Sequence, residues 1–204
     1  MEGALTAFDR CFCTPSTALW YLPSLGLNGD FQLMKRLLLA AALSLLTATS
    51  ALAQTVILVR HAEKADASAD PLLSAAGQAR ATALAVALSD ADLTHVFVSP
   101  LQRTRLTAEL TAQAHAVTPE VFSFEGGTDA HIRRIADRIR ALPGEAVVLV
   151  VGHSNTVPLI ARALGETGAS EMRDCEYDRL IVVSVEDDGD SPAVIARYGE
   201  SANC

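Results

Sequence analysis

The sequence predicts an α/β fold: a single three-layer domain built on a mostly parallel sheet with helices on both faces. Short runs of apolar, β-branched residues alternate with longer segments in which apolar residues recur at helical spacing. The chain of 204 residues is 50% hydrophobic, which is enough for a buried core. No repeat, low-complexity tract or linker interrupts residues 54–204, so we expect this region to form one domain.

The first half of this domain is expected to contain two strands, each followed by a helix. Residues 55–59 are almost all apolar and predict a buried strand. The helix expected over Ser74–Leu88 begins with a residue whose hydroxyl can cap the first turn. A second strand is expected over 95–99. The helix expected over Pro100–Gln113 then carries its proline in the first turn, where proline is well tolerated.

The second half continues the alternation and ends in two strands. Thr128 is expected to cap a helix whose isoleucines have helical spacing, and Pro143 with Gly144 is expected to end it. The last two strands flank a turn-rich stretch over 187–192, so we expect a hairpin at a sheet edge. The other expected elements are an extended or irregular segment over 117–124, a strand over 147–151, a helix over 156–164, and strands over 180–185 and 193–198.

Residues 34–53 have the composition of a secretory signal peptide. Lysine and arginine follow Met34, an apolar run over 37–46 comes next, and Ala-Leu-Ala over 51–53 provides a small-residue cleavage site. We expect cleavage there to leave Gln54 as the new N-terminus, with an uncleaved anchor as the alternative.

Export affects what is expected of the rest of the chain. The protein is expected in the periplasm or outside the cell, with no stable membrane span after cleavage. Residues 1–33, which are mixed and acidic, are expected to be a mis-assigned or disordered extension before a true start at Met34. Cys175 and Cys204 remain after cleavage. In an oxidising compartment they are expected either to form a disulfide or to stay as two unpaired thiols.

Charge and composition exclude several partners. The chain has 24 Asp and Glu against 16 Lys and Arg, a formal charge of −8, so nucleic acid is not an expected partner. No His-Glu-x-x-His motif or other compact ligand set occurs, and we expect neither a metal nor a cofactor. The oligomeric state is left open by the sequence.

Three of the expected strands end in polar residues. Arg60 and His61 follow the first strand, Arg103 lies just beyond the second, and His153 follows the strand over 147–151. Ligands of open α/β sheets bind outside the carboxyl ends of the strands. We therefore expect these four side chains to converge.

Such a cluster suits a small anion with several negative charges. Arginine offers forked donors that match the geometry of phosphate. Nearby like charge disfavours the protonated form of a histidine, and a neutral imidazole held against phosphorus is a competent nucleophile. The remaining donors would neutralise the equatorial oxygens, which is the main contribution of a protein to phosphoryl transfer.

The same segments resemble the signature of a known family. Arg-His-Ala-Glu-Lys over 60–64 resembles the Arg-His motif of the histidine phosphatase superfamily, in its phosphoglycerate-mutase-like branch. Ser-Pro-Leu-Gln-Arg-Thr over 99–104, followed by Thr107 and Ala108, resembles the second segment of that branch, and Gly-His-Ser over 152–154 resembles the third. All three occur in the family order, each after an expected strand.

The resemblance implies roles for particular residues. His61 would be the catalytic nucleophile that becomes phosphohistidine. Arg60, Arg103 and His153 would hold the phosphoryl group of a small phosphorylated substrate, with His153 as a second catalytic residue. Water would then cleave the intermediate.

The sequence departs from the family pattern in two respects. Ala62 stands where many members carry glycine. The general acid of the family, a carboxylate after the second segment, has no clear equivalent. Glu125 lies in the right region, Asp129 and Glu120 are rivals, and the absence of any acid is the remaining alternative.

We therefore expect a metal-independent phosphatase that hydrolyses phosphomonoesters. The alternatives are mutase-like phosphoryl transfer, a phosphohistidine phosphatase that acts on phosphoproteins, and a non-enzymatic phosphate-binding module. An α/β-hydrolase is disfavoured, because Thr156 replaces the last glycine of Gly-x-Ser-x-Gly and no histidine follows that serine. His95, His115 and His131 are expected on the surface.

Overall fold

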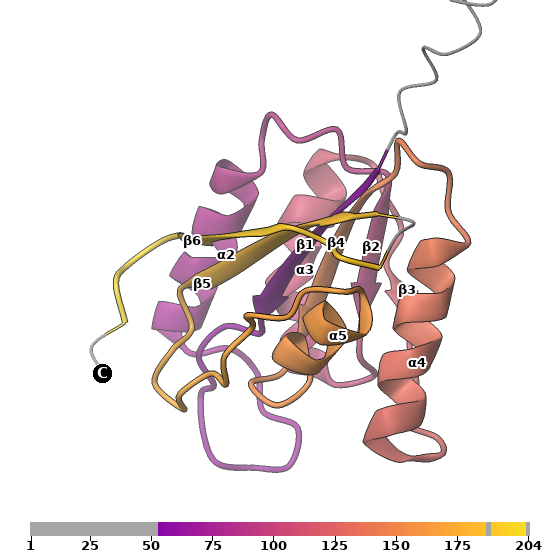
Figure 1. Ribbon diagram of the computed structural model, residues 1–204. Coiled ribbons are helices and arrows are strands. Elements are labelled where there is room, and N and C mark those ends of the chain that lie inside the picture. Colours follow the sequence, from indigo (N-terminus) through magenta and orange to yellow (C-terminus); the bar gives the residue numbers. More distant parts are fainter. Residues whose placement is uncertain (1–52, 187–188, 203–204) are drawn as a thin grey trace, which may run out of the picture. The chain divides into compact units, whose positions relative to one another are not determined.

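The computed structural model describes residues 53–186 and 189–202 of the chain (Figure 1). The extension expected over 1–33, and the signal peptide expected over 34–53 except for its last residue, therefore lie outside the described residues.

Six strands form one mixed sheet in the order β3-β2-β4-β1-β5-β6 (Figure 1). The neighbours among β3, β2, β4 and β1 run parallel, whereas β5 runs antiparallel to both β1 and β6. The sheet is mostly parallel, as predicted, and its last two strands form the predicted hairpin at one edge. The bounds are β1 Gln54–Arg60, β2 His95–Val98, β3 Glu120–Val121, β4 Val147–Gly152, β5 Arg179–Val185 and β6 Ala193–Arg197.

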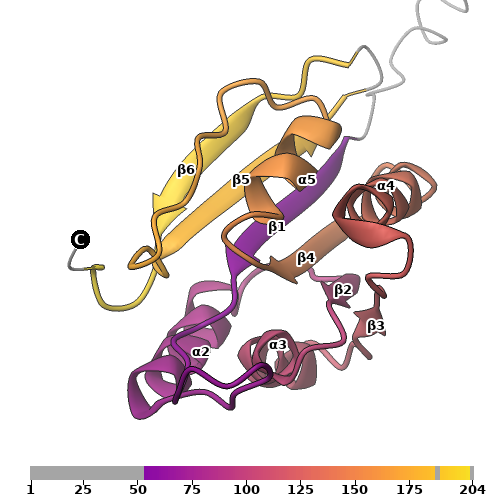
Figure 2. The same cartoon turned by 90° about the horizontal axis from the view of Figure 1, so that it is seen from below.

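Helices cover both faces of this sheet, which confirms the three-layer prediction (Figure 2). Val56 and Leu58 of β1 belong to the core shared with α4 and α5. Ile57 and Val59 point the other way, into the core shared with α2 and α3. A strand covered on both faces buries the side chains of both faces, which is why residues 56–59 of this strand are all apolar. The bounds are α2 Ala75–Ala87, α3 Gln102–Ala114, α4 Gly127–Arg140 and α5 Val157–Ala163.

None of the helices in the described part of the chain is long and apolar enough to cross a membrane.

Different kinds of hydrogen bond cap the first turns of α2 and α3. Ser74 caps α2 as predicted, because its Oγ accepts a hydrogen bond from the N–H of Gly77 at 3.1 Å. The prediction that Pro100 lies in the first turn of α3 is wrong, since that helix begins at Gln102. The N–H of Gln102 donates to Oδ1 of Asp70 at 2.8 Å. The acceptor therefore comes from a loop distant in sequence, which no local pattern reveals.

The start of α4 was also predicted wrongly. Thr128 does not cap this helix, which begins at Gly127. The preceding Gly126 adopts a φ of 76°, in the left-handed region that glycine occupies without strain. The tight turn of the backbone, and not a side-chain cap, therefore sets where the helix begins. The helix ends at Arg140, just before Pro143.

Candidate active site

The ends of β1 and β4 bring two histidines together. These strands are parallel neighbours, and Arg60 lies opposite Gly152 in their register. The backbone N–H of His61 then donates to the carbonyl oxygen of Gly152 at 2.9 Å. The imidazole rings of His61 and His153 meet edge to face, with their centroids 5.3 Å apart.

One hydrogen bond determines the tautomer of His61. Its Nδ1 lies 2.8 Å from the carbonyl oxygen of Ala62. A carbonyl oxygen can only accept, so Nδ1 carries the proton and the neutral ring keeps its lone pair on Nε2. This leaves Nε2 as the nucleophilic atom of the ring.

Whereas His61 is bonded through Nδ1, His153 is hydrogen-bonded through Nε2. Its Nε2 lies 3.0 Å from Oγ of Ser99, which lies 3.0 Å from Oγ1 of Thr104. The Thr104 hydroxyl also lies 2.9 Å from the carbonyl oxygen of Leu101, and we assign its proton to that acceptor. Ser99 then donates to Thr104 and accepts from His153. We therefore assign a proton to Nε2 of His153, because this assignment makes all three contacts hydrogen bonds.

Both imidazoles are neutral at physiological pH. Burial, together with the positive charges of Arg60 and Arg103, lowers the pKa of His61 to about 4, against the opposing effect of its hydrogen bond to a carbonyl oxygen. Burial, and after it the neighbouring His61 and Arg103, lowers the pKa of His153 to about 3. The positive charges of Arg60 and Arg103 contribute to the lowered pKa of both rings.

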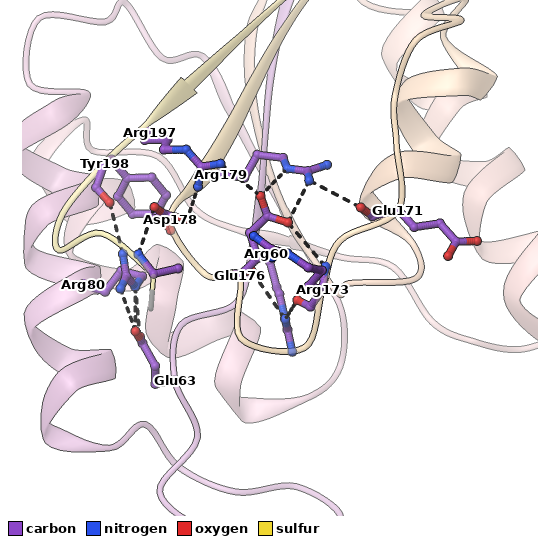
Figure 3. Close-up of polar contacts among 11 residues, drawn as sticks. Arg60, Glu63, Arg80, Glu171, Arg173, Glu176, Asp178, Arg179, Arg197 and Tyr198 are labelled. Carbon is purple, nitrogen blue, oxygen red and sulfur yellow. Dashed lines mark hydrogen bonds and ion pairs between the residues drawn. The ribbon is translucent and has the colours of Figure 1, made fainter. Parts of the chain in front are cut away.

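Arg60 is clamped by a loop that precedes β5 (Figure 3). Its Nη1 donates to the carbonyl oxygens of Arg173 and Asp174 at 2.9 Å each and lies 3.4 Å from that of Glu176. Its Cζ lies 4.1 Å from the centroid of the Tyr177 ring, within the range of a cation–π contact. The buried Nε has no hydrogen-bond partner among the described residues.

Arg103 is likewise bonded through Nη1 while its Nε has no partner among the described residues. Its Nη1 donates to the carbonyl oxygen of Ala69 at 3.3 Å and lies 3.8 Å from Oδ1 of Asp70. Its buried Nε has no partner in the part of the chain that the structure describes. Buried donors are normally paired, so two unpartnered guanidinium N–H groups indicate a binding site for an anion.

Glu125 lies in the loop between β3 and α4, and its side chain is exposed. The ring of the adjacent Phe124 has its centroid 5.7 Å from that of His153, so this loop borders the site. Of its rivals, Glu120 forms an ion pair with Arg138 at 3.4 Å. Asp129 is exposed in the first turn of α4. The role of Glu125 as general acid stays a prediction.

Two residues at or beside the site were not predicted. The Tyr177 ring lies against Arg60, and its centroid is 6.0 Å from that of His61. It belongs to an irregular segment without a recognisable motif. His131 was expected on the surface but is 1% exposed, and its ring centroid lies 4.3 Å from that of Phe124. Its spacing of four residues from the buried Ile135 is the pattern that could have indicated this burial.

The loop that clamps Arg60 also contains Cys175, which is disulfide-bonded. Cys204, its predicted partner, lies outside the described residues. The pairing of Cys175 with Cys204 therefore stays a prediction.

Residues 56–123 match the histidine phosphatase superfamily (branch 1). The matched stretch contains Arg60, His61 and Arg103, and the register of β1 and β4 adds His153. Over these residues the chain is similar to that superfamily. The similarity agrees with the resemblance of the first two sequence segments. No curated protein sequence matches the chain.

Several solved structures share the fold of this chain. A mycobacterial glucosyl-3-phosphoglycerate phosphatase is 16% identical, with a TM-score of 0.56 over 74% of this chain and 100% of that chain. Its complex with inorganic phosphate gives 14% identity and a TM-score of 0.55 over 74% of this chain and 99% of that one. The protein histidine phosphatase SixA, complexed with tungstate, is 22% identical, with a TM-score of 0.55 over 70% of this chain and 96% of that chain.

Proposed function

We propose that the protein is a phosphatase that hydrolyses phosphomonoesters through a phosphohistidine formed on His61. One observation carries the proposal: a neutral imidazole with its lone pair on Nε2 shares a buried site with two guanidinium groups, Arg60 and Arg103, that each keep an unpartnered N–H. A neutral nucleophile beside fixed positive charge is what attack on a phosphate dianion requires.

In the first step, Nε2 of His61 attacks phosphorus. The N–P bond forms while the bond from phosphorus to the leaving oxygen breaks, and the leaving oxygen takes up a proton. Arg60 and Arg103 neutralise the charge on the equatorial oxygens. His153, whose Nε2 proton is engaged by Ser99, completes the wall of the site on the side of β4.

In the second step, water attacks the phosphohistidine. A new O–P bond forms, the N–P bond breaks, and the proton of the water passes to a base or to solvent. His61 returns to its neutral form and inorganic phosphate leaves. We propose that this chemistry needs no metal ion, and a chelator should leave the activity unchanged.

The test of this mechanism is the intermediate itself. Rapid quenching after mixing with a 32P-labelled aryl phosphate should trap a phosphoprotein that is stable in alkali and labile in acid. His61→Ala should abolish both this label and turnover while the protein remains folded. His115→Ala is the matched control, because this half-buried histidine contacts the carbonyl oxygen of Leu88 and not the site. Turnover retained in His61→Ala would overturn the proposal.

We propose Glu125 as the acid that protonates the leaving oxygen. A general acid contributes about 10²–10⁴-fold, and it matters most for leaving groups of high pKa. Glu125→Gln should therefore reduce kcat/KM for an alkyl phosphate by roughly that factor and for an aryl phosphate much less. Asp129→Asn is the matched control. An equal response of both substrates would exclude Glu125 from this role.

A phosphohistidine-containing protein is the second candidate substrate. Among the described residues, no acidic side chain forms a hydrogen bond or ion pair with His61 or His153. A leaving imidazole nitrogen depends less on such an acid than an alkoxide does. The SixA structure, which shares the fold, is that of a protein histidine phosphatase. Faster dephosphorylation of a phosphohistidine protein than of any small ester would favour this candidate.

We further propose that the enzyme is exported and begins at Gln54. The first residue of β1 is Gln54, so cleavage after Ala53 would leave the whole strand intact. The side chain of Gln54 donates from Nε2 to the carbonyl oxygen of Leu142 at 2.8 Å, which suits a structured N-terminus. N-terminal sequencing of the protein from native cell fractions tests both the start and the compartment.

A further inference from the structure

We infer that Glu176 is a positioning residue that holds Arg60 in place to bind the phosphoryl group. The inference rests on the proposed function, because the anion concerned is the phosphoryl group of the substrate. Glu176 itself does not touch that group; it acts through the loop that clamps Arg60, residues 173–178.

The carboxylate of Glu176 ties this loop to the sheet (Figure 3). Its side chain is 2% exposed, and both oxygens are engaged by donors. Oε1 accepts from Nε of Arg179 at 2.9 Å, and Oε2 accepts from Nη2 of the same residue at 2.7 Å. Arg197 of β6 adds a contact to Oε1 at 3.4 Å, and the backbone N–H of Arg173 donates to Oε2 at 3.3 Å.

The backbone of the same loop holds Arg60 from the other side. The carbonyl oxygens that receive Nη1 belong to Arg173, Asp174 and Glu176. The backbone of Arg173 therefore makes two hydrogen bonds. Its N–H donates to the Glu176 carboxylate, and its carbonyl oxygen accepts from Arg60. The contact between the Glu176 carboxylate and Arg179 of β5 thereby determines where the guanidinium of Arg60 lies.

The negative charge of Glu176 is essential to this arrangement. A glutamine at position 176 would place an amide N–H against Arg179 or against the N–H of Arg173, and two donors cannot bond to each other. The loop would then have to move to relieve the mismatch. Displacements of about 1 Å in a group that orients the substrate can cost as much as 10²-fold in activity.

Asp178 provides a matched control for this role. It is 1% exposed and pairs with the same Arg197, at 2.7 Å. Its Oδ2 accepts from the N–H of Ala202 at 3.1 Å, close to the C-terminus. Among the described residues, its carboxylate pairs with Arg197 and Ala202 and not with the residues whose carbonyl oxygens hold Arg60. Asp178→Asn therefore removes a buried charge of the same kind without loosening the Arg60 clamp.

The experiment measures binding of inorganic phosphate by calorimetry, independently of turnover. The proteins are wild type, Glu176→Gln, Asp178→Asn, Arg60→Ala and the double variant Arg60→Ala/Glu176→Gln, each checked for folding by circular dichroism. We expect Glu176→Gln to weaken phosphate binding about tenfold and Asp178→Asn to leave it near wild type. The double variant should bind no more weakly than Arg60→Ala alone, because Glu176 acts only through Arg60.

Each other result overturns the inference. Wild-type affinity in Glu176→Gln, or an equal loss in Asp178→Asn, would show that Glu176 serves only stability. Additive losses in the double variant would show that Glu176 does not act through Arg60. If Glu176→Gln does not fold, Arg179→Lys replaces it, because lysine keeps the charge but loses the two-pronged contact. Failure of the proposed function is distinguishable, since it would appear as a wild-type protein that neither binds phosphate nor forms the His61 intermediate.

Discussion

The two imidazoles of the site lie 5.3 Å apart, yet hydrogen bonding gives them different chemistry. His61 is bonded through Nδ1, so its Nε2 lone pair is available. His153 is bonded through Nε2, which engages Ser99. The difference comes from the acceptor that each ring meets, a carbonyl oxygen for one and a hydroxyl for the other. It leaves Nε2 of His61 free to act as the proposed nucleophile, whereas Nε2 of His153 is engaged.

The Ser99 hydroxyl is expected to orient His153. Ser99→Ala would leave the buried Nε2–H without an acceptor, which costs about 1–3 kcal/mol of the free energy of unfolding. We expect kcat/KM to fall about tenfold as well, because the ring loses its orientation. Urea unfolding and steady-state kinetics measure the two effects.

The control for Ser99→Ala is Thr111→Val. The Thr111 hydroxyl is buried and has no hydrogen-bond partner among the described residues, so its loss should not destabilise the protein. Wild-type kinetics in Ser99→Ala would show that the hydroxyl does not orient the ring.

At the scale of elements, the turn from β4 into α5 presents His153. Its backbone N–H donates to Oγ1 of Thr156 at 2.9 Å. A Cβ on Gly152 would lie 2.9 Å from that same oxygen and 3.0 Å from Cγ2 of Val157. Glycine is therefore required here by close packing between the strand end and the helix start.

Gly152→Ala is expected to damage both stability and activity. Overpacking of this kind costs about 1–3 kcal/mol, and relief of the contact with Thr156 would displace the backbone of His153. Thermal unfolding and kcat/KM for an aryl phosphate measure the result. Gly168→Ala is the control, because its Cβ would meet only the flexible end of Glu166, at 3.0 Å. Equal behaviour of the two variants would contradict the argument.

For the whole molecule, the buried neutral histidines make stability depend on pH. The pKa is lowered to about 4 for His61 and to about 3 for His153, from the ordinary value of 6.5. Between pH 6.5 and 4 the unfolded chain therefore binds more protons than the folded protein. Their contribution to stability is complete above pH 6.5 and is lost as the pH falls through this window.

The free energy of unfolding should fall by up to about 1.4 kcal/mol per pH unit for each of these histidines below pH 6. Urea titrations at pH 7, 6, 5 and 4.5 measure this slope. His61→Gln and His153→Gln should each flatten it. An unchanged slope in these variants would mean that the rings are not held neutral.

Much of this protein follows from local sequence. The alternation of apolar runs predicts the strands and helices, because burial on one or two faces imposes a period on the residues themselves. The polar residues at the strand ends predict a site, because parallel strands end at a common edge. This reasoning predicts Arg60, His61, Arg103 and His153, whose catalytic and binding roles stay predictions.

The remaining features depend on contacts between segments far apart in the chain. Arg60 is held by carbonyl oxygens more than a hundred residues away, and α3 is capped by Asp70 from another loop. Backbone carbonyl groups belong to every residue type, so no residue identity marks them in advance. The sequence therefore determined the kind of site and its charged and nucleophilic groups. Only the tertiary structure decided which nitrogen of each histidine is available and what positions Arg60, because hydrogen bonds select partners by proximity in space.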